Sequence, residues 1–285
     1  MLSEARHLLG AAAQGWWDDR AMSMGAAIAF YTLFSLAPVL LIAVAVAGMA
    51  FGREAAQGAV VAEIGGLIGQ QSAESVQALI ASAGNMGSGI VGTISGVVTF
   101  AVLATGAFAE LQDDLNIIWR VKPAQGYGLA SFIRTRVLSF ALIVTIGFLL
   151  LASLAIDAGV SAISESLSQV YSDLSAALHV LNLAISLIIS TILFALIFKV
   201  LPDTDIAWRD VWFGAVVTAL LFSTGKFLIG LYLGQSNIAS SYGAAASLIT
   251  ILLWIYYSSQ ILLFGAELTK AFAERRGSRA PPAAP

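Results

Sequence analysis

The sequence predicts an all-α, polytopic membrane protein with six transmembrane helices and with both termini in the cytoplasm. Three observations support this fold class. Hydrophobic residues make up 59% of the 285-residue chain and charged residues only 11%, whereas about a quarter of the residues in a soluble domain are charged. Six apolar windows are each long enough to cross a bilayer. Almost all lysine and arginine residues lie in the segments that would be on one side of the membrane if these windows cross it.

The predicted spans are about 20 residues long or longer, which is the length that an α-helix needs to cross the hydrocarbon core. They run over residues 22–51, 90–109, 137–156, 178–198, 211–233 and 244–266. The first window is longer than one perpendicular helix requires, and it contains Pro38. Because proline removes an amide donor, we expect the first helix to be bent or steeply tilted.

The spans divide the chain into three segments. Residues 1–21 form a cytoplasmic juxtamembrane segment; they lack a compact apolar stretch and an A-x-A cleavage pattern, so we expect no removed signal peptide. The six-helix transmembrane domain covers residues 22–268. Residues 269–285, whose end is rich in proline and alanine, should form a largely disordered cytoplasmic tail.

The longest connection, about residues 53–89, is predicted to be a periplasmic helical insertion. Its apolar residues recur with helical periodicity, and the pattern is interrupted at Gly65 and Gly66. We therefore expect two short amphipathic helices that lie near the membrane surface.

Basic residues set the predicted orientation. Of the 14 lysine and arginine residues, Arg53 lies on the outer side and Lys226 within the fifth span. The others lie on the side of the amino terminus: Arg6, Arg20, Arg120, Lys122, Arg134, Arg136, Lys199, Arg209, Lys270, Arg275, Arg276 and Arg279. Because the loops on the cytoplasmic side carry such an excess, both termini are predicted to be cytoplasmic.

Lys226 is the one charged residue of the fifth predicted span. It lies in the outer half of the membrane, seven residues before Leu233, or about 10 Å at 1.5 Å per residue. Two interpretations stay open. The side chain can snorkel, so that its ammonium reaches the outer headgroups. Alternatively, it faces the bundle interior and binds an anionic group of a molecule that crosses the membrane.

Small and hydroxylated residues around Lys226 favour the interior interpretation. Gly225 precedes the lysine, and a G-x-x-x-G pattern follows it, so this helix has a face suited to close packing. The hydroxyl groups of Ser223, Thr224 and Tyr232 could belong to the same polar track. These three residues and Lys226 are candidate substrate-binding residues.

Three carboxylates follow the second span. Glu110, Asp113 and Asp114 are spaced i, i+3 and i+4, which places them on one helix face at the cytoplasmic boundary. They are candidates for a proton relay or a magnesium site. More often, three such carboxylates form a solvated helix end that pairs with nearby bases, here Arg120 and Lys122.

Two further sets of charges border the membrane. Glu267, at the cytoplasmic end of the sixth span, is a candidate for proton coupling or a helix terminus that pairs with Lys270. Arg134 and Arg136 immediately precede the third span, where basic residues attract anionic headgroups. They are candidate headgroup ligands or simple anchors.

The sequence offers no catalytic constellation. Cysteine is absent, which excludes disulfides and thiol catalysis. His7 and His179 are predicted on opposite sides of the membrane, so they cannot share a metal ion. GNMGSG at 84–89 lacks the lysine of a phosphate-binding loop. We therefore predict no catalytic residue, no metal site and no cofactor.

Four stretches carry a resemblance to a known family: AIAFYTLFSLAPVLLI, LQDDLNIIWRV, FSTGKFLIGLYL and SYGAAASLITILLWIYYSSQILLFGAELTKAF. Over roughly residues 15–273 the chain resembles the YihY/BrkB-type inner-membrane family, once labelled "ribonuclease BN-like". The resemblance implies six spans in the bacterial cytoplasmic membrane and a role in envelope integrity or in transport of lipid-like molecules. It also adds Tyr242 to the candidate substrate-binding residues. The recurring positions that match are Lys226, Tyr242, Gly243, Trp254, Gly265 and Glu267.

Three functions from different classes are consistent with the sequence. The first is a transporter or flippase of an anionic lipid-like envelope molecule, with Lys226 on an inner polar track. The second is a non-transporting scaffold for envelope assembly, which binds partner helices through small-residue faces. The third, a membrane-bound ribonuclease, would need a metal-binding carboxylate cluster, and the chain lacks a large soluble domain to hold RNA.

The expected partners are therefore membrane lipids, including anionic ones, and no nucleic acid. Small-residue faces serve helix bundles and dimers alike, so homo-oligomerisation stays open.

Overall fold

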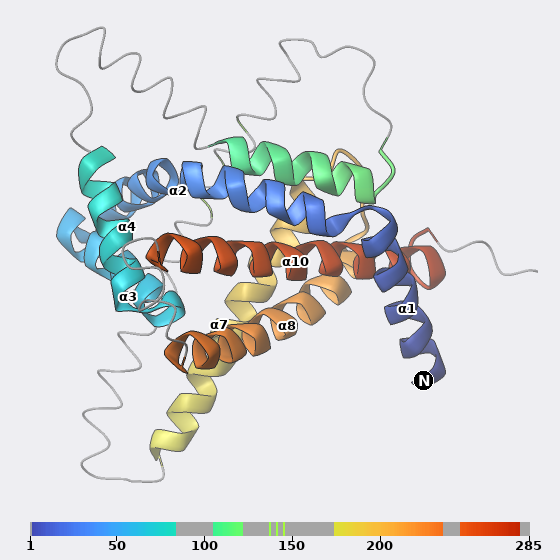
Figure 1. The fold of residues 1–285 in the computed structure, drawn as a ribbon. Helices are drawn as coiled ribbons and strands as arrows, with labels where there is room; N and C mark the ends of the chain where they lie inside the picture. Colours follow the sequence, from blue (N-terminus) through green and yellow to red (C-terminus); the bar gives the residue numbers. More distant parts are fainter. Residues whose placement is uncertain are drawn as a thin grey trace, which may run out of the picture.

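The computed structural model describes residues 2–83, 105–121, 137, 141, 145, 174–235 and 246–279. Every regular element in these ranges is helical (Figure 1), which confirms the all-α fold class. The helices are α1 (Leu2–Asp18), α2 (Ala21–Phe51), α3 (Arg53–Ile68), α4 (Gln70–Ala83), α7 (Leu174–Val200), α8 (Trp208–Gln235) and α10 (Ala246–Arg275), with a further helix over 105–118.

Three of the described helices are long and apolar enough to cross a membrane. They contribute Leu183–Val200, Trp208–Leu228 and Ala246–Arg275. A fourth span results if Arg6–Asp18 and Ala21–Ala37, which are bent by 66°, count as one broken span. These helices correspond to the fourth, fifth, sixth and first predicted windows. Most of the second and third windows lies outside the described residues, so the six-span topology stays a prediction.

The first predicted span is one long helix. α2 continues for 31 residues and passes through Pro38 without a break in the helix. It begins after Arg20, which adopts the left-handed conformation with φ 58°. The turn at Asp19 and Arg20 thus separates α2 from α1, and the helix axes change direction there by 66°.

Two helices follow α2, as the periodicity predicts, but they separate at a different glycine. The predicted interruption at Gly65 and Gly66 was wrong, because both residues lie inside α3. The break is at Gly69, whose φ of 89° is accessible to glycine at little cost. The Gly69 amide donates to the Gly65 carbonyl at 3.0 Å, so this pair of glycines completes the last turn of α3.

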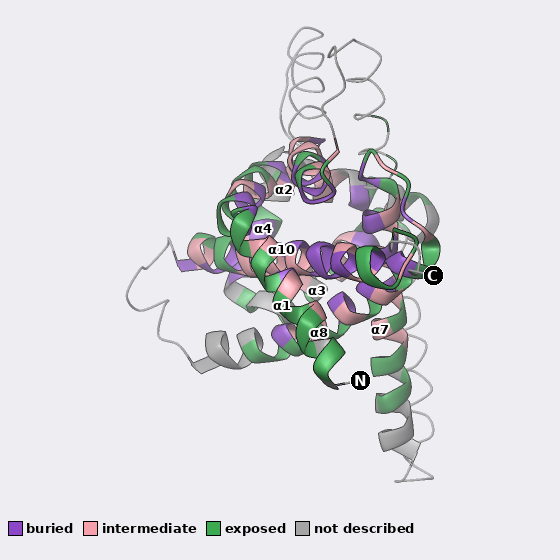
Figure 2. Cartoon of the chain, turned by 90° about the vertical axis from the view of Figure 1, so that its right-hand side faces the viewer, coloured by how far each residue is buried: buried purple, intermediate pink, exposed green. Residues whose placement is uncertain are grey.

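α10 is the central helix of the described structure. The main apolar cluster joins it to α2, helix 105–118, α7 and α8, with fully buried Leu115, Phe198 and Leu263 among its members. A second cluster joins the start of α10 to α2, α3 and α4 through Ile251 and Val76. Figure 2 shows the buried residues along α10, whereas the distal part of α7 is largely exposed.

α8 and α10 pack through reciprocal glycine–threonine contacts. An added Cβ at Gly214 would overlap Thr269, and one at Gly265 would overlap Thr218. Each threonine hydroxyl donates at 2.7 Å to the carbonyl four residues earlier on its own helix. Both hydroxyls are therefore satisfied inside the buried interface, and the glycines allow the two backbones to approach closely.

Polar contacts join the helices at the end that carries α1. Asp203, between α7 and α8, accepts hydrogen bonds from the amides of Gln112 and Asn116 at 3.1 and 3.0 Å. Arg279 donates to Thr204 Oγ1 at 2.7 Å. Figure 1 shows α3 and α4 at the opposite end of the molecule. The residues following α10 thus contact the same end as α1, the end that the basic residues predict to be cytoplasmic.

Candidate functional site

Lys226 lies on the packed side of α8. Buried residues recur along this helix at Val211, Ala215 and Ala219, and Phe222 packs against the same cluster. Lys226 comes one turn after Phe222 and is half-buried. Because residues four apart share a helix face, the lysine continues this buried stripe toward the predicted outer side.

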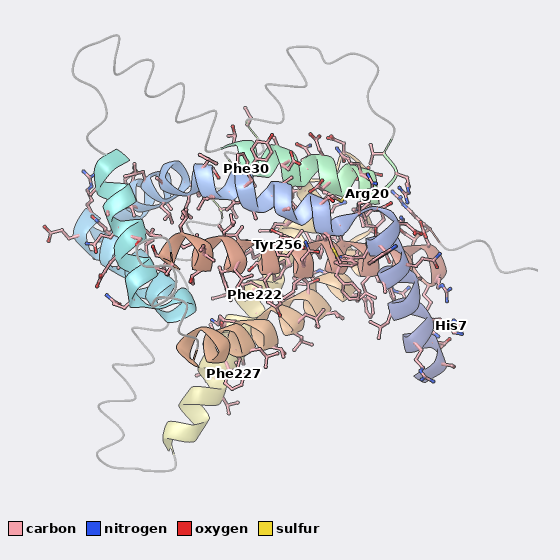
Figure 3. The ribbon with its side chains drawn as sticks, viewed as in Figure 1. His7, Arg20, Phe30, Phe222, Phe227 and Tyr256 are labelled. Atoms are coloured by element: carbon pink, nitrogen blue, oxygen red, sulfur yellow. The ribbon has the colours of Figure 1, made fainter. Side chains whose placement is uncertain are left out.

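The neighbours of Phe222 show which helices contact the buried face of α8. The Phe222 ring centroid lies 5.6 Å from that of Phe194 on α7 and 5.9 Å from that of Trp254 on α10. Figure 3 shows Phe222 on the side of α8 toward α10 and Phe227 on the opposite side, where it is 67% exposed. Residues four apart differ by about 40° around an α-helix and adjacent residues by about 100°, so Lys226 leaves α8 closer to the direction of Phe222 than to that of Phe227.

No carboxylate within the described ranges forms an ion pair with Lys226. The residue next to it, Gly225, is buried, and an added Cβ there would overlap the hydroxyl end of Tyr257 on α10. Tyr257 is a nearby polar residue that the sequence prediction missed. The only signal for it in the sequence was a polar aromatic side chain within an apolar predicted span.

The other predicted ligands on α8 differ in how far they are buried. Ser223 is half-buried, whereas Thr224 is exposed and donates its hydroxyl to the Leu220 carbonyl at 2.9 Å. Tyr232 lies on α8, but its side chain is outside the described set.

Three further predicted ligands fall on parts of the chain that are not described. They are Tyr242, Arg134 and Arg136. Their roles stay predictions.

The three carboxylates after the second predicted span have unequal environments. Asp114 is buried, Glu110 is half-buried and Asp113 is exposed. Burial, followed by repulsion from Glu110 and Asp113, raises the pKa of Asp114 to about 7. Burial also raises the pKa of Glu110, with Asp113 adding to the effect. The pKa of Asp113 is also raised, first because the neighbouring protein partly desolvates its carboxyl group and then because Asp203 repels it, although the residue as a whole is exposed.

Glu267 meets a carboxylate that sequence reasoning did not include. Its Oε2 lies 3.8 Å from Lys270 Nζ, as the helix-terminus interpretation expects. The structure also brings Asp19 beside Glu267, because Glu267 lies against Gly15, whose carbonyl accepts a hydrogen bond from the Asp19 amide. Arg120, expected beside the carboxylates of its own helix, forms a 2.7 Å ion pair with Asp19 instead. The run of charges Asp18-Asp19-Arg20 at the start of the first span was the available signal.

The reach of Arg120 depends on how its helix ends. Arg120 has φ 53°, its amide donates to the Ile117 carbonyl at 3.0 Å, and the Val121 amide donates to the Asn116 carbonyl at 2.9 Å. This pair of hydrogen bonds is a Schellman motif, in which glycine usually takes the left-handed position. Arginine there accepts an uncommon backbone conformation, and its side chain pairs with Asp19 in the turn between α1 and α2.

Metal-ligating residues do not converge in the described part of the chain. No group of three or more histidine, aspartate or glutamate side chains there is arranged to hold a metal ion. The arrangement at Asp19 and Glu267 is a contact between two carboxyl groups with a cation beside each.

Comparison with known proteins identifies the family. The family described as virulence factor BrkB matches residues 12–285. The chain belongs to the BrkB family. The resemblance drawn from the four sequence stretches is thereby confirmed. No solved structure matches this BrkB-family chain.

Curated relatives of this BrkB-family chain are named as membrane proteins. A UPF0761 membrane protein from Rhodospirillum centenum is 26% identical over 270 residues, covering 93% of this chain and 57% of the relative. A UPF0761 membrane protein from Verminephrobacter eiseniae is 32% identical over 251 residues, covering 85% and 56%. The UPF0761 membrane protein YihY from Salmonella paratyphi B is 32% identical over 189 residues, covering 65% and 60%.

The chain thus spans little more than half the length of these relatives. Family membership and the apolar helices together identify an integral membrane protein.

Proposed function

We propose that this protein moves an anionic lipid-like envelope molecule across the bacterial cytoplasmic membrane, as a transporter or flippase. The observation that supports this most directly is the half-buried Lys226, which has no carboxylate partner in the described residues. A lysine on a packed apolar helix face usually pairs with an acid or serves a ligand. An anionic headgroup would supply the missing charge.

The surroundings of Lys226 suit an amphiphile better than a small hydrophilic ion. Phe222 and Trp254 provide an aromatic wall on the same side of α8. Tyr257 adds a hydroxyl group beside Gly225. A headgroup near the ammonium and an acyl chain along the aromatic residues would use both kinds of contact. Arg134 and Arg136 are proposed to attract headgroups at the cytoplasmic surface.

A lipid-translocation assay tests the proposal. The purified chain is reconstituted in liposomes that contain a fluorescent anionic phospholipid, and movement between leaflets is followed by quenching of the outer leaflet. We expect Lys226→Met to slow translocation by about tenfold or more, because a charge-assisted hydrogen bond contributes about 1.5–3 kcal/mol. Lys226→Arg retains the charge and should keep most of the activity.

A matched control uses the same helix. Thr224→Ala changes an exposed residue whose hydroxyl already bonds to its own backbone, so translocation should stay near the wild-type rate. Equal rates for Lys226→Met and wild type would reject the role of the lysine. If liposomes that contain the wild-type protein show no lipid translocation, the transport function is rejected and the scaffold function is favoured.

A further inference from the structure

Asp19 and Glu267 form a buried carboxyl pair at the end of the molecule where α1 meets α2. Asp19 lies in the turn between these helices, and Glu267 lies near the carboxyl end of α10. Each side chain is only 3% exposed. The two carboxyl groups are neighbours, because Glu267 lies against Gly15, and the Asp19 amide donates to the Gly15 carbonyl at 2.9 Å. The pair therefore joins residues from opposite ends of the sequence in a site closed to solvent.

Cations lie beside only two of the four carboxyl oxygens of the pair, and only one of these two contacts is a hydrogen bond. Arg120 Nη2 lies 2.7 Å from Asp19 Oδ1, and Lys270 Nζ lies 3.8 Å from Glu267 Oε2. The second distance is too long for a hydrogen bond. Asp19 Oδ2 and Glu267 Oε1 are both buried and have no hydrogen-bond partner in the described structure.

Packing by α1 keeps the pair enclosed. An added Cβ at Gly15 would overlap Glu267 Oε2, so the carboxyl group lies directly against the α1 backbone. Only a residue without a side chain leaves this space. The two acids are consequently held together by three elements: α1, the turn that follows it, and α10.

An ionised carboxylate accepts hydrogen bonds and donates none. Two ionised carboxylates in contact would repel one another because their charges are alike. Neither could donate a hydrogen bond to the free oxygen of the other. A proton on one group converts that group into a donor for the other. Arg120 and Lys270 favour a negative charge on the pair, so they oppose the binding of a second proton.

We propose that Glu267 carries a proton in the resting protein at neutral pH and donates it in a hydrogen bond to the neighbouring carboxylate of Asp19. Loss of this proton leaves two negative charges in contact between α10 and the turn at which α1 and α2 diverge by 66°. Deprotonation thus pushes α1 and α10 apart. The use of this proton to drive transport rests on the proposed function, whereas its presence does not.

Infrared spectroscopy tests the proton site without any transport assay. The carbonyl-stretching band of a protonated carboxyl group is recorded at neutral pH, with purified protein in lipid nanodiscs. Because Asp114 has a pKa of about 7 and would contribute its own band, all proteins carry Asp114→Asn. We expect this protein to show the band, and we expect a rise in pH to remove it.

Three added substitutions assign the band. Glu267→Gln and Asp19→Asn should each abolish it, whereas Glu274→Gln, which changes an exposed acid on the same helix, should leave it intact. Tryptophan fluorescence checks that each variant is folded. The Asp114→Asn protein keeps both Asp19 and Glu267, so the absence of the band from this protein overturns the proposal. A band that persists in both folded pair variants overturns it as well. Failure of lipid translocation would leave the band unchanged and would count against the proposed function alone.

Discussion

Asp114 shows how strongly the position of one carboxyl group determines its chemistry. It belongs to a set of three acids that the sequence places on one helix face, beyond the predicted end of the second span. The structure buries Asp114, leaves its Oδ2 without a hydrogen-bond partner among the described residues, and exposes Asp113. Burial is the main reason that the pKa of Asp114 is raised to about 7.

This raised pKa predicts that stability falls as the pH rises. The folded protein binds a proton at Asp114 more tightly than the unfolded chain does, so the stabilisation is complete below about pH 4 and is lost as the pH increases to about 7. The slope should be at most about 1.4 kcal/mol per pH unit. Asp114→Asn should reduce the change in unfolding midpoint over this range, measured by tryptophan fluorescence in detergent.

Asp18→Asn is the matched control, because Asp18 is exposed. Its midpoint should follow that of the wild type at every pH. An Asp114→Asn protein with an unaltered pH dependence would contradict the assignment of this titration to Asp114.

At the scale of helices, the interface between α8 and α10 depends on small residues at matched heights. Gly214 faces Thr269, and Gly265 faces Thr218. α8 is apolar almost all around, so the distribution of its apolar residues does not mark one face as the packed one. Contacts with α10 select that face.

Gly265→Ala should destabilise the protein by about 1–3 kcal/mol, because the new methyl group overlaps the short, branched side chain of Thr218. Gly66→Ala, on α3, is the control: no atom lies within 4 Å of an added Cβ. It should be neutral or slightly stabilising, since alanine favours a helix by about 1 kcal/mol over glycine. Thermal unfolding in detergent compares the two. A double variant with Thr218→Ala should recover part of the loss, and equal midpoints for both single variants would contradict the close packing.

At the scale of the whole molecule, the polar contacts gather at one end. Arg276 pairs with Glu4 of α1, and Arg279 contacts Thr204 between α7 and α8. α3 and α4 lie at the other end (Figure 1). This arrangement fits the predicted orientation, in which both termini face the cytoplasm.

Single cysteine residues can test that orientation, because the chain contains no native cysteine. Glu54→Cys, exposed on α3, should react with a membrane-impermeant maleimide in intact cells. Asp18→Cys, exposed at the end of α1, should react only after the membrane is permeabilised. Labelling of Asp18→Cys in intact cells would contradict the predicted topology.

The sequence predicted the helices better than the contacts between them. Four of the six apolar windows correspond to described helices, and two helices follow the first span as expected. The break at Gly69 was not predicted, because Gly65, Gly66 and Gly69 are equivalent in the sequence until the hydrogen bond that ends α3 distinguishes them. The family resemblance added Tyr242, which lies outside the described residues.

By itself, the sequence determined that this is a helical membrane protein. A bilayer requires long apolar segments whose backbone groups bond within the segment, and both requirements can be read from one stretch of chain. Only the tertiary structure decided that Asp19 meets Glu267 and that Lys226 continues the stripe beside Phe222. These contacts join residues from separate helices, and their heights and facing sides depend on how apolar surfaces pack, which no single segment encodes.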